Sequence, residues 1–152
     1  MSQSLSRIYI HGVFHIRYNS PEIQKKDKEK LYAYMGSIIK DNQCIPIIIN
    51  GVENHVHILF IMSKNTALSA IMEQVKKHSS RWMKTLGSDY DNFGWQGGYG
   101  GFSVSQSIHN ITKKYIKNQE EHHRKTTFKE EYLRLLQEYG VDYNEDYLWS
   151  NK

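Results

Sequence analysis

Residues 45–62 read IPIIINGVENHVHILFIM, which is two apolar runs joined by a short polar segment. The runs Ile45–Ile49 and His55–Met62 are rich in β-branched residues, and this composition is typical of strands. Asn50 and Gly51 are turn-forming residues between them. The stretch therefore predicts a β-hairpin with two histidines on its return strand.

The two histidines of this strand lie on one face. Successive side chains of a strand point to opposite faces, so His55 and His57 project together while Val56 packs on the other side. A His-x-His pair on a strand is more often structural than a ligand pair. The polar turn just before His55 favours a functional site, because sites concentrate where loops meet rigid elements.

Outward from the hairpin, alternation of apolar residues predicts strands, and recurrence at helical spacing predicts amphipathic helices. The expected elements are a strand over residues 8–17, a helix over 25–41, a second helix capped by Asn65 or Thr66 and stopped by Gly87, a strand over 102–104, a third helix over 108–123, and a fourth from the capping box of Thr127 and Glu130 to Tyr139, closed by Gly140.

This order is β-α-β-β-α-β followed by further helices, and it predicts an α+β chain with a ferredoxin-like antiparallel sheet. The first and third strands of such a sheet are central, so the histidine pair would sit mid-sheet. An additional C-terminal helix would carry Tyr115.

Composition bounds the protein to one globular domain over residues 1–152, with a peripheral tail from about residue 141. The formal net charge of +4 permits a polyanionic partner. A single cysteine, Cys44, has no partner for an intrachain disulfide, which fits a reducing cytoplasm. Residues 1–6 do not resemble a signal peptide, and no apolar segment approaches the length of a membrane span. We therefore expect a cytoplasmic protein without a membrane partner.

Tyr115 and Gln119 stand four residues apart on the third predicted helix and would share a face. Tyr115 alone is equally well explained as a half-buried helix aromatic. The lysines around it, Lys113, Lys114 and Lys117, favour a functional role, because nearby cations lower the barrier to attack by a phenol. For His122 and His123 the preferred interpretation is that they are solvated helix residues.

If the strand and the helix meet, His55, His57, Gln119 and Tyr115 would surround one small volume. Two imidazoles and an amide oxygen would accept magnesium or manganese, and the metal would polarise a phosphate that Tyr115 attacks. A closed structural zinc site is disfavoured because Cys44 stands alone.

Two further groups suit nucleic-acid contacts. The basic side of the second helix, with Lys76, Lys77, Arg81 and Lys84, is by default a solvated face, and it becomes a phosphate track if it borders the histidine strand. Trp95 and Tyr99 in the glycine-rich segment 93–101, followed by Phe102, are either core anchors or platforms for unpaired bases.

Taken together, NHVHIL at 54–59, WQGGYGGFSVS at 95–105 and YIKNQEEHH at 115–123 resemble the single-tyrosine HUH transposases of the insertion sequence 200/605 superfamily. The resemblance spans nearly the whole chain. It implies a ferredoxin-like fold and an obligate homodimer in which the tyrosine helix of one subunit serves the histidine pair of the other. It also implies that His55, His57 and Gln119 are metal ligands and that Tyr115 is the nucleophile. Asn54 departs from the aspartate expected in many relatives.

The leading hypothesis is a DNA transposase that cleaves and rejoins single-stranded DNA, folded into hairpins at insertion-sequence ends, through a covalent 5′-phosphotyrosine. Three alternatives remain open at this point. A domesticated relative would process palindromic repeats with the same chemistry. A non-catalytic protein would only bind DNA hairpins, and a metal-dependent hydrolase of small phosphoesters would form no tyrosine adduct.

Overall fold

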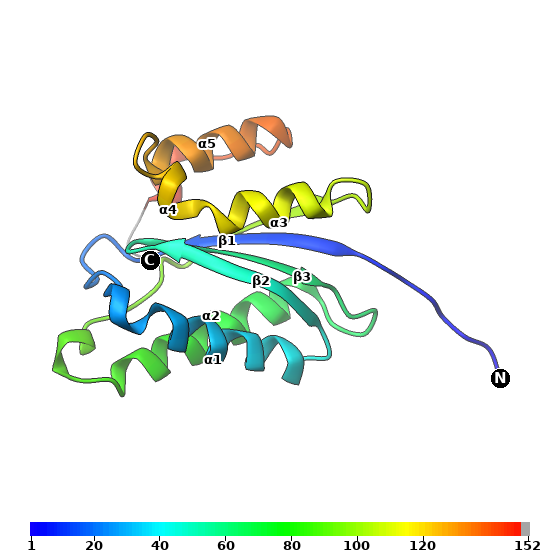
Figure 1. The fold of residues 1–152 in the computed structure, drawn as a ribbon, viewed down its shortest axis with the longest axis horizontal. Helices are drawn as coiled ribbons and strands as arrows, with labels where there is room; N and C mark the ends of the chain where they lie inside the picture. Colours follow the sequence, from blue (N-terminus) through cyan, green and yellow to red (C-terminus); the bar gives the residue numbers. More distant parts are fainter. Residues whose placement is uncertain (150–152) are drawn as a thin grey trace.

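A computed structural model describes residues 1–149, in which four strands form one antiparallel sheet between two layers of helices (Figure 1). The strands are β1 (Tyr9–His15), β2 (Ile45–Val52), β3 (His55–Ile61) and β4 (Gly100–Val104). Their order is β2-β3-β1-β4, so β1 and β3 are neighbours at the centre of the sheet. The ferredoxin-like arrangement predicted from the sequence is confirmed.

The helices divide between the two faces of the sheet (Figure 1). One face carries α1 (Lys28–Asp41) and α2 (Leu68–Lys84), each flanked by a short 3-10 helix, η1 (Lys25–Asp27) and η2 (Ser88–Tyr90). The other face carries α3 (His109–Lys117), α4 (Gln119–His122) and α5 (Phe128–Glu138), and α6 (Glu145–Leu148) follows near the C-terminus. No helix within residues 1–149 is both long and apolar enough to cross a membrane.

The period-two pattern of β3 sorts its side chains between the layers. Val56, Ile58 and Phe60 are fully buried in the core beneath α1 and α2. His55 and His57 are also fully buried, but they face α3, α4 and α5. The sheet therefore has one apolar face and one face that holds polar side chains in a closed space.

The hairpin turn was predicted in the wrong place. β2 continues through Asn50 and Gly51, which pair with His57 and Val56, and the turn falls at residues 53–54. Gly51 is required for close approach, because a Cβ there would collide with the backbone carbonyl oxygen of His55. Here a glycine indicates tight strand packing, not a turn.

Two predicted helix boundaries were also wrong. The N-cap of α2 is Ala67, and no side chain caps this end, so neither Asn65 nor Thr66 has the predicted role. The predicted third helix is interrupted at Asn118, which separates α3 from α4. The capping box of Thr127 and Glu130 at the start of α5 is confirmed.

Candidate active site

Both histidines of β3 are held by a partner on the Nδ1 side of the ring. His55 Nδ1 lies 2.7 Å from Asn54 Oδ1, and His57 Nδ1 lies 2.8 Å from Nε2 of His11 on β1. The two Nε2 atoms consequently face the helices on this side of the sheet. Asn54, which stands where an aspartate was expected, therefore orients a histidine.

Tyr115 and Gln119 reach the same place despite the break between α3 and α4. The side-chain amide of Asn50 on β2 donates to the carbonyl oxygens of Ile116 and Lys117, each at 3.0 Å, and so holds the end of α3. Gln119 is fully buried, with its Oε1 3.1 Å from His55 Nε2. The Tyr115 ring is half-buried, and its centroid lies 5.9 Å from that of His57.

The predicted strand and helix residues therefore meet within one chain. The family resemblance implied instead that the tyrosine of one subunit serves the histidines of the other. In the described structure, Tyr115 lies beside His57 of its own chain.

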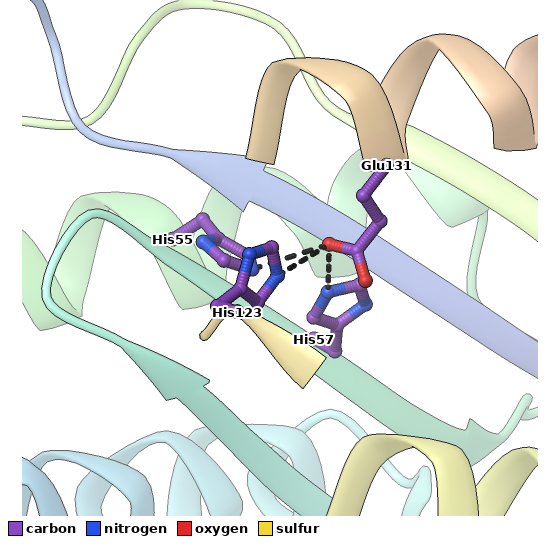
Figure 2. Close-up of side chains that lie close together, drawn as sticks. All are labelled: His55, His57, His123 and Glu131. Carbon is purple, nitrogen blue, oxygen red and sulfur yellow. Dashed lines mark hydrogen bonds and ion pairs between the residues drawn. The ribbon is translucent and has the colours of Figure 1, made fainter. Parts of the chain in front are cut away.

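Glu131 and His123 complete the cluster (Figure 2), and neither was predicted from the sequence to be a site residue. Glu131, at the start of α5, is fully buried, and its Oε1 lies 3.0 Å from Nε2 of both His57 and His123 and 3.3 Å from Nε2 of His55. Its Oε2 accepts hydrogen bonds from the Tyr115 hydroxyl and, at 3.1 Å, from the Gln119 amide. One carboxylate thus joins the histidines to the tyrosine.

The prediction that His122 and His123 are solvated was wrong. The side chain of His123 is only 9% exposed, and that of His122 is 22% exposed with its Nε2 3.3 Å from Glu131 Oε2. The polar run from Gln119 to Arg124 resembles a solvated helix face, but the break at Asn118 turns part of it inward.

A signal for Glu131 was present in the sequence. The inward face of α5 consists of residues at helical spacing: Phe128, Glu131, Tyr132, Leu135 and Leu136. A glutamate on such a stripe is informative, because glutamate is almost never fully buried unless it is paired.

The pKa values of Glu131 and Tyr115 are shifted in opposite directions. Burial alone would raise the pKa of Glu131, but hydrogen bonds from His123, His55 and His57 lower it below its ordinary value. Burial, reinforced by the negative charge of Glu131, raises the pKa of Tyr115. The phenol is therefore protonated at neutral pH and donates to an ionised carboxylate.

The donor set fits a cation. Nε2 of His55, His57 and His123 and a carboxylate oxygen of Glu131 all lie within 4.8 Å of one another. Burial lowers the pKa of His55 to about 4, so its ring is neutral near pH 7 and carries one N–H. Acceptors nevertheless face both of its nitrogens, namely Asn54 Oδ1 at 2.7 Å on one side and Gln119 Oε1 at 3.1 Å on the other. A cation bound by Nε2 and the amide oxygen would resolve this mismatch.

The residues predicted to bind DNA are spread over two sides of the molecule. α2, with Lys77, Arg81 and Lys84 exposed, covers the face of the sheet opposite the histidines, so it does not border their cluster. Lys76 is half-buried and donates to the carbonyl oxygens of Gln96 and Gly98 at 2.7 and 2.6 Å. Lys76 therefore supports the glycine-rich loop.

The aromatic residues of that loop have different environments. Trp95 is buried, donates its indole N–H to Ser79 Oγ at 2.9 Å and packs edge-on against Phe14, and Phe102 is also buried. These two are core anchors. Tyr99 is 36% exposed and lines a cleft of about 470 Å³ together with Arg17, Lys76, Lys77 and Lys84.

A second cleft, of about 660 Å³, opens beside Tyr115. Its lining includes Lys114, Lys125 and His122, so it joins basic surface residues to the edge of the cluster. Lys113 and Lys117 are exposed on α3 nearby. This cleft gives a ligand an approach to the tyrosine from outside.

Comparisons with known proteins agree with this architecture. The family described as Transposase IS200 like matches residues 4–119. A candidate transposase from Deinococcus radiodurans R1 is similar in structure, with a TM-score of 0.60 and 16% identity, over 78% of this chain and 98% of that one. A REP-associated tyrosine transposase bound to a REP hairpin has a TM-score of 0.59 and 12% identity, over 81% of this chain and 74% of that one. At these identities the likeness concerns the fold. A search of curated proteins gave no match.

Proposed function

The chain belongs to the IS200-like transposase family, and from this membership we propose that it cuts and rejoins single-stranded DNA through a covalent bond to Tyr115. The observation that carries the proposal is the contact of the Tyr115 hydroxyl with Glu131, whose other oxygen contacts His57 and His123. A nucleophile and a phosphate-activating cluster thus occupy one site.

Glu131 would accept the proton that the nucleophile loses. The Tyr115 phenol must lose its proton as its oxygen bonds to phosphorus, and Glu131 Oε2 is the acceptor it already contacts. The bond from phosphorus to the 3′ oxygen of the DNA breaks, and that oxygen takes up a proton. The 5′ side of the break stays on Tyr115, which conserves the bond energy for rejoining and makes a nucleotide cofactor unnecessary.

His55, His57, His123, Glu131 and Gln119 would hold a divalent cation. When bound, the cation supplies a Lewis acid that withdraws charge from the scissile phosphate. The donor set favours manganese over magnesium, because imidazole nitrogens are poor ligands for magnesium and the cluster offers three of them.

The proposed substrate is a single strand folded into a hairpin. The cleft beside Tyr115 would receive the scissile segment, with Lys114 and Lys125 contacting its phosphates. The basic cleft at α2, on the other side of the sheet, would contact a different part of the DNA through Lys77, Lys84 and Tyr99.

A covalent-adduct assay tests the proposal. The protein is incubated with a labelled strand carrying an element-end hairpin, with manganese or with a chelator, and resolved on a denaturing gel. We expect a covalent, metal-dependent band for the native chain and its loss by at least about 10³-fold in Tyr115→Phe, with hairpin affinity unchanged. Tyr143→Phe, at an exposed tyrosine away from the cluster, is the matched control.

The other outcomes separate the alternatives. An adduct that persists in Tyr115→Phe would remove Tyr115 from the role of nucleophile. Hairpin binding without cleavage would support a binding protein, and release of product without an adduct would support a hydrolase. A domesticated relative is distinguished by flanking DNA that lacks matched hairpin ends. The homodimer implied by the family resemblance stays a prediction.

A further inference from the structure

His11 on β1 lies beside the cluster, in contact with His57 and Tyr115. The function proposed above assigns it no role. Its side chain is buried, with 3% of the residue exposed. Its ring stacks on that of His57, with centroids 5.0 Å apart, and its Nε2 lies 2.8 Å from His57 Nδ1. It also packs edge-on against Phe102 and Tyr115.

The contact between His11 and His57 joins two ring nitrogens, one of which donates while the other accepts. A neutral imidazole has one N–H and one lone pair. Without a cation, His57 Nε2 lies 3.0 Å from Glu131 Oε1 and donates to this carboxylate. To bind a cation, Nε2 must give up its proton, and the neutral ring then carries its proton on Nδ1. A buried N–H needs an acceptor, and His11 Nε2 is the atom at hydrogen-bond distance from Nδ1.

His55 has the same arrangement with a different residue. Its Nδ1 lies 2.7 Å from Asn54 Oδ1, and its Nε2 faces Gln119 and Glu131. The two histidines of β3 thus have separate supports, one from the preceding residue and one from the neighbouring strand. This repetition distinguishes a built support from incidental packing.

We propose that His11 is a positioning residue that accepts the Nδ1 proton of His57 and so holds the His57 Nε2 lone pair toward the centre of the cluster. The inference rests on the proposed metal site. Replacing a residue that is hydrogen-bonded to a metal ligand typically weakens metal affinity about 10- to 100-fold.

Metal affinity provides the first test. The dissociation constant for manganese is measured by calorimetry in the native chain, His11→Phe and His11→Gln. Phenylalanine keeps the ring and removes the acceptor, whereas glutamine returns a polar atom near the position of Nε2. We expect the dissociation constant to rise about 10- to 100-fold in His11→Phe and to recover in His11→Gln.

His15→Phe is the matched control on the same strand. His15 packs between Phe128 and Trp149, and its nitrogens contact the carbonyl oxygens of Ile16 and Leu148, not the cluster. This variant should bind manganese like the native chain. Equal affinities in His11→Phe, His15→Phe and the native chain would overturn the positioning role while leaving the metal site intact.

The His57 tautomer provides a second test that requires no variant. Nitrogen NMR of the native chain, labelled at histidine and loaded with diamagnetic zinc as a probe, should show a proton on His57 Nδ1. A proton on Nε2, or no metal binding by the native chain, would overturn the inference. The second result would also overturn the proposed metal site, so the two failures are distinguishable.

Discussion

Glu131 is a buried charge whose free-energy cost is offset only by its partners. Its two oxygens contact His55, His57, His123, Gln119 and Tyr115, and the residue has no exposed surface. Removing one partner of a buried ion pair leaves the other charge uncompensated, which costs more than the pair itself contributes. The cluster therefore depends on every partner and on the protonation of its histidines.

We predict that the metal-free protein loses stability as the pH falls from about 6.5 to about 4. Burial lowers the pKa of His11 to about 3 and that of His55 to about 4. In this window the unfolded chain binds protons at these rings and the folded chain does not, so the free energy of unfolding falls by up to about 1.4 kcal/mol per pH unit for each ring.

Burial also lowers the pKa of His122, which therefore adds to the loss below about pH 6.5, whereas His123 and Glu131 act outside this window. The pKa of His123 is raised against the effect of burial by Glu131, so its stabilising contribution is already fully present below about pH 6.5. The pKa of Glu131 is lowered, so its contribution is lost only below about pH 4.3. Urea unfolding between pH 7 and pH 4.5, with a chelator present, measures how steeply the free energy of unfolding falls with pH. His11→Gln should make this fall less steep. A flat profile would contradict the prediction.

The break at Asn118, between α3 and α4, lies between the two site residues Tyr115 and Gln119. A continuous helix would carry Gln119 onward in register with Tyr115. Instead, the amide of Asn50 holds the last carbonyl groups of α3, and α4 restarts at Gln119 against β3. Helical periodicity indicated a continuous helix here, but the end of α3 is held by Asn50, which lies 66 positions before Ile116 in the sequence.

We predict that Asn50→Ala lowers both stability and adduct formation. Loss of its hydrogen bonds to Ile116 and Lys117 should cost about 1–2 kcal/mol and displace Gln119. Asn42→Ala is the matched control, because Asn42 Nδ2 donates in the same way to Ile38 O at the end of α1, away from the site. Urea unfolding should show a loss in both variants, and the adduct assay a loss only in Asn50→Ala. Equal adduct yields would separate the α3–α4 break from catalysis.

The two faces of the sheet carry different kinds of side chain. The face under α1 and α2 is an apolar core, and the face under α3, α4 and α5 holds the cluster (Figure 1). Because residues from β1, β3, α3, α4 and α5 meet on this second face, one chain supplies both the tyrosine and the histidines. Two variant chains that each lack a different site residue should therefore not complement each other.

We predict that Tyr115→Phe mixed with His57→Ala forms no adduct. Each chain would carry one defect in its own site, and pairing of the two chains would not repair it. A mixture of the native chain with Tyr115→Phe, which retains adduct in proportion to the native chain, controls for inhibition by the variant. Recovery of adduct in the double-variant mixture, measured on the denaturing gel, would show instead that subunits exchange their tyrosines.

Local pattern alone determined the strands, the amphipathic helices and the shared face of His55 and His57, because alternation and helical spacing act over a few neighbouring residues. The same pattern placed the hairpin turn at Asn50 and Gly51 and continued α3 past Asn118. Only the tertiary structure brought Glu131, His123 and His11 to the histidine pair, since contacts between distant segments have no local period. Local composition and spacing thus specified the sheet and half of the site, and packing of the C-terminal helices on that sheet determined the other half.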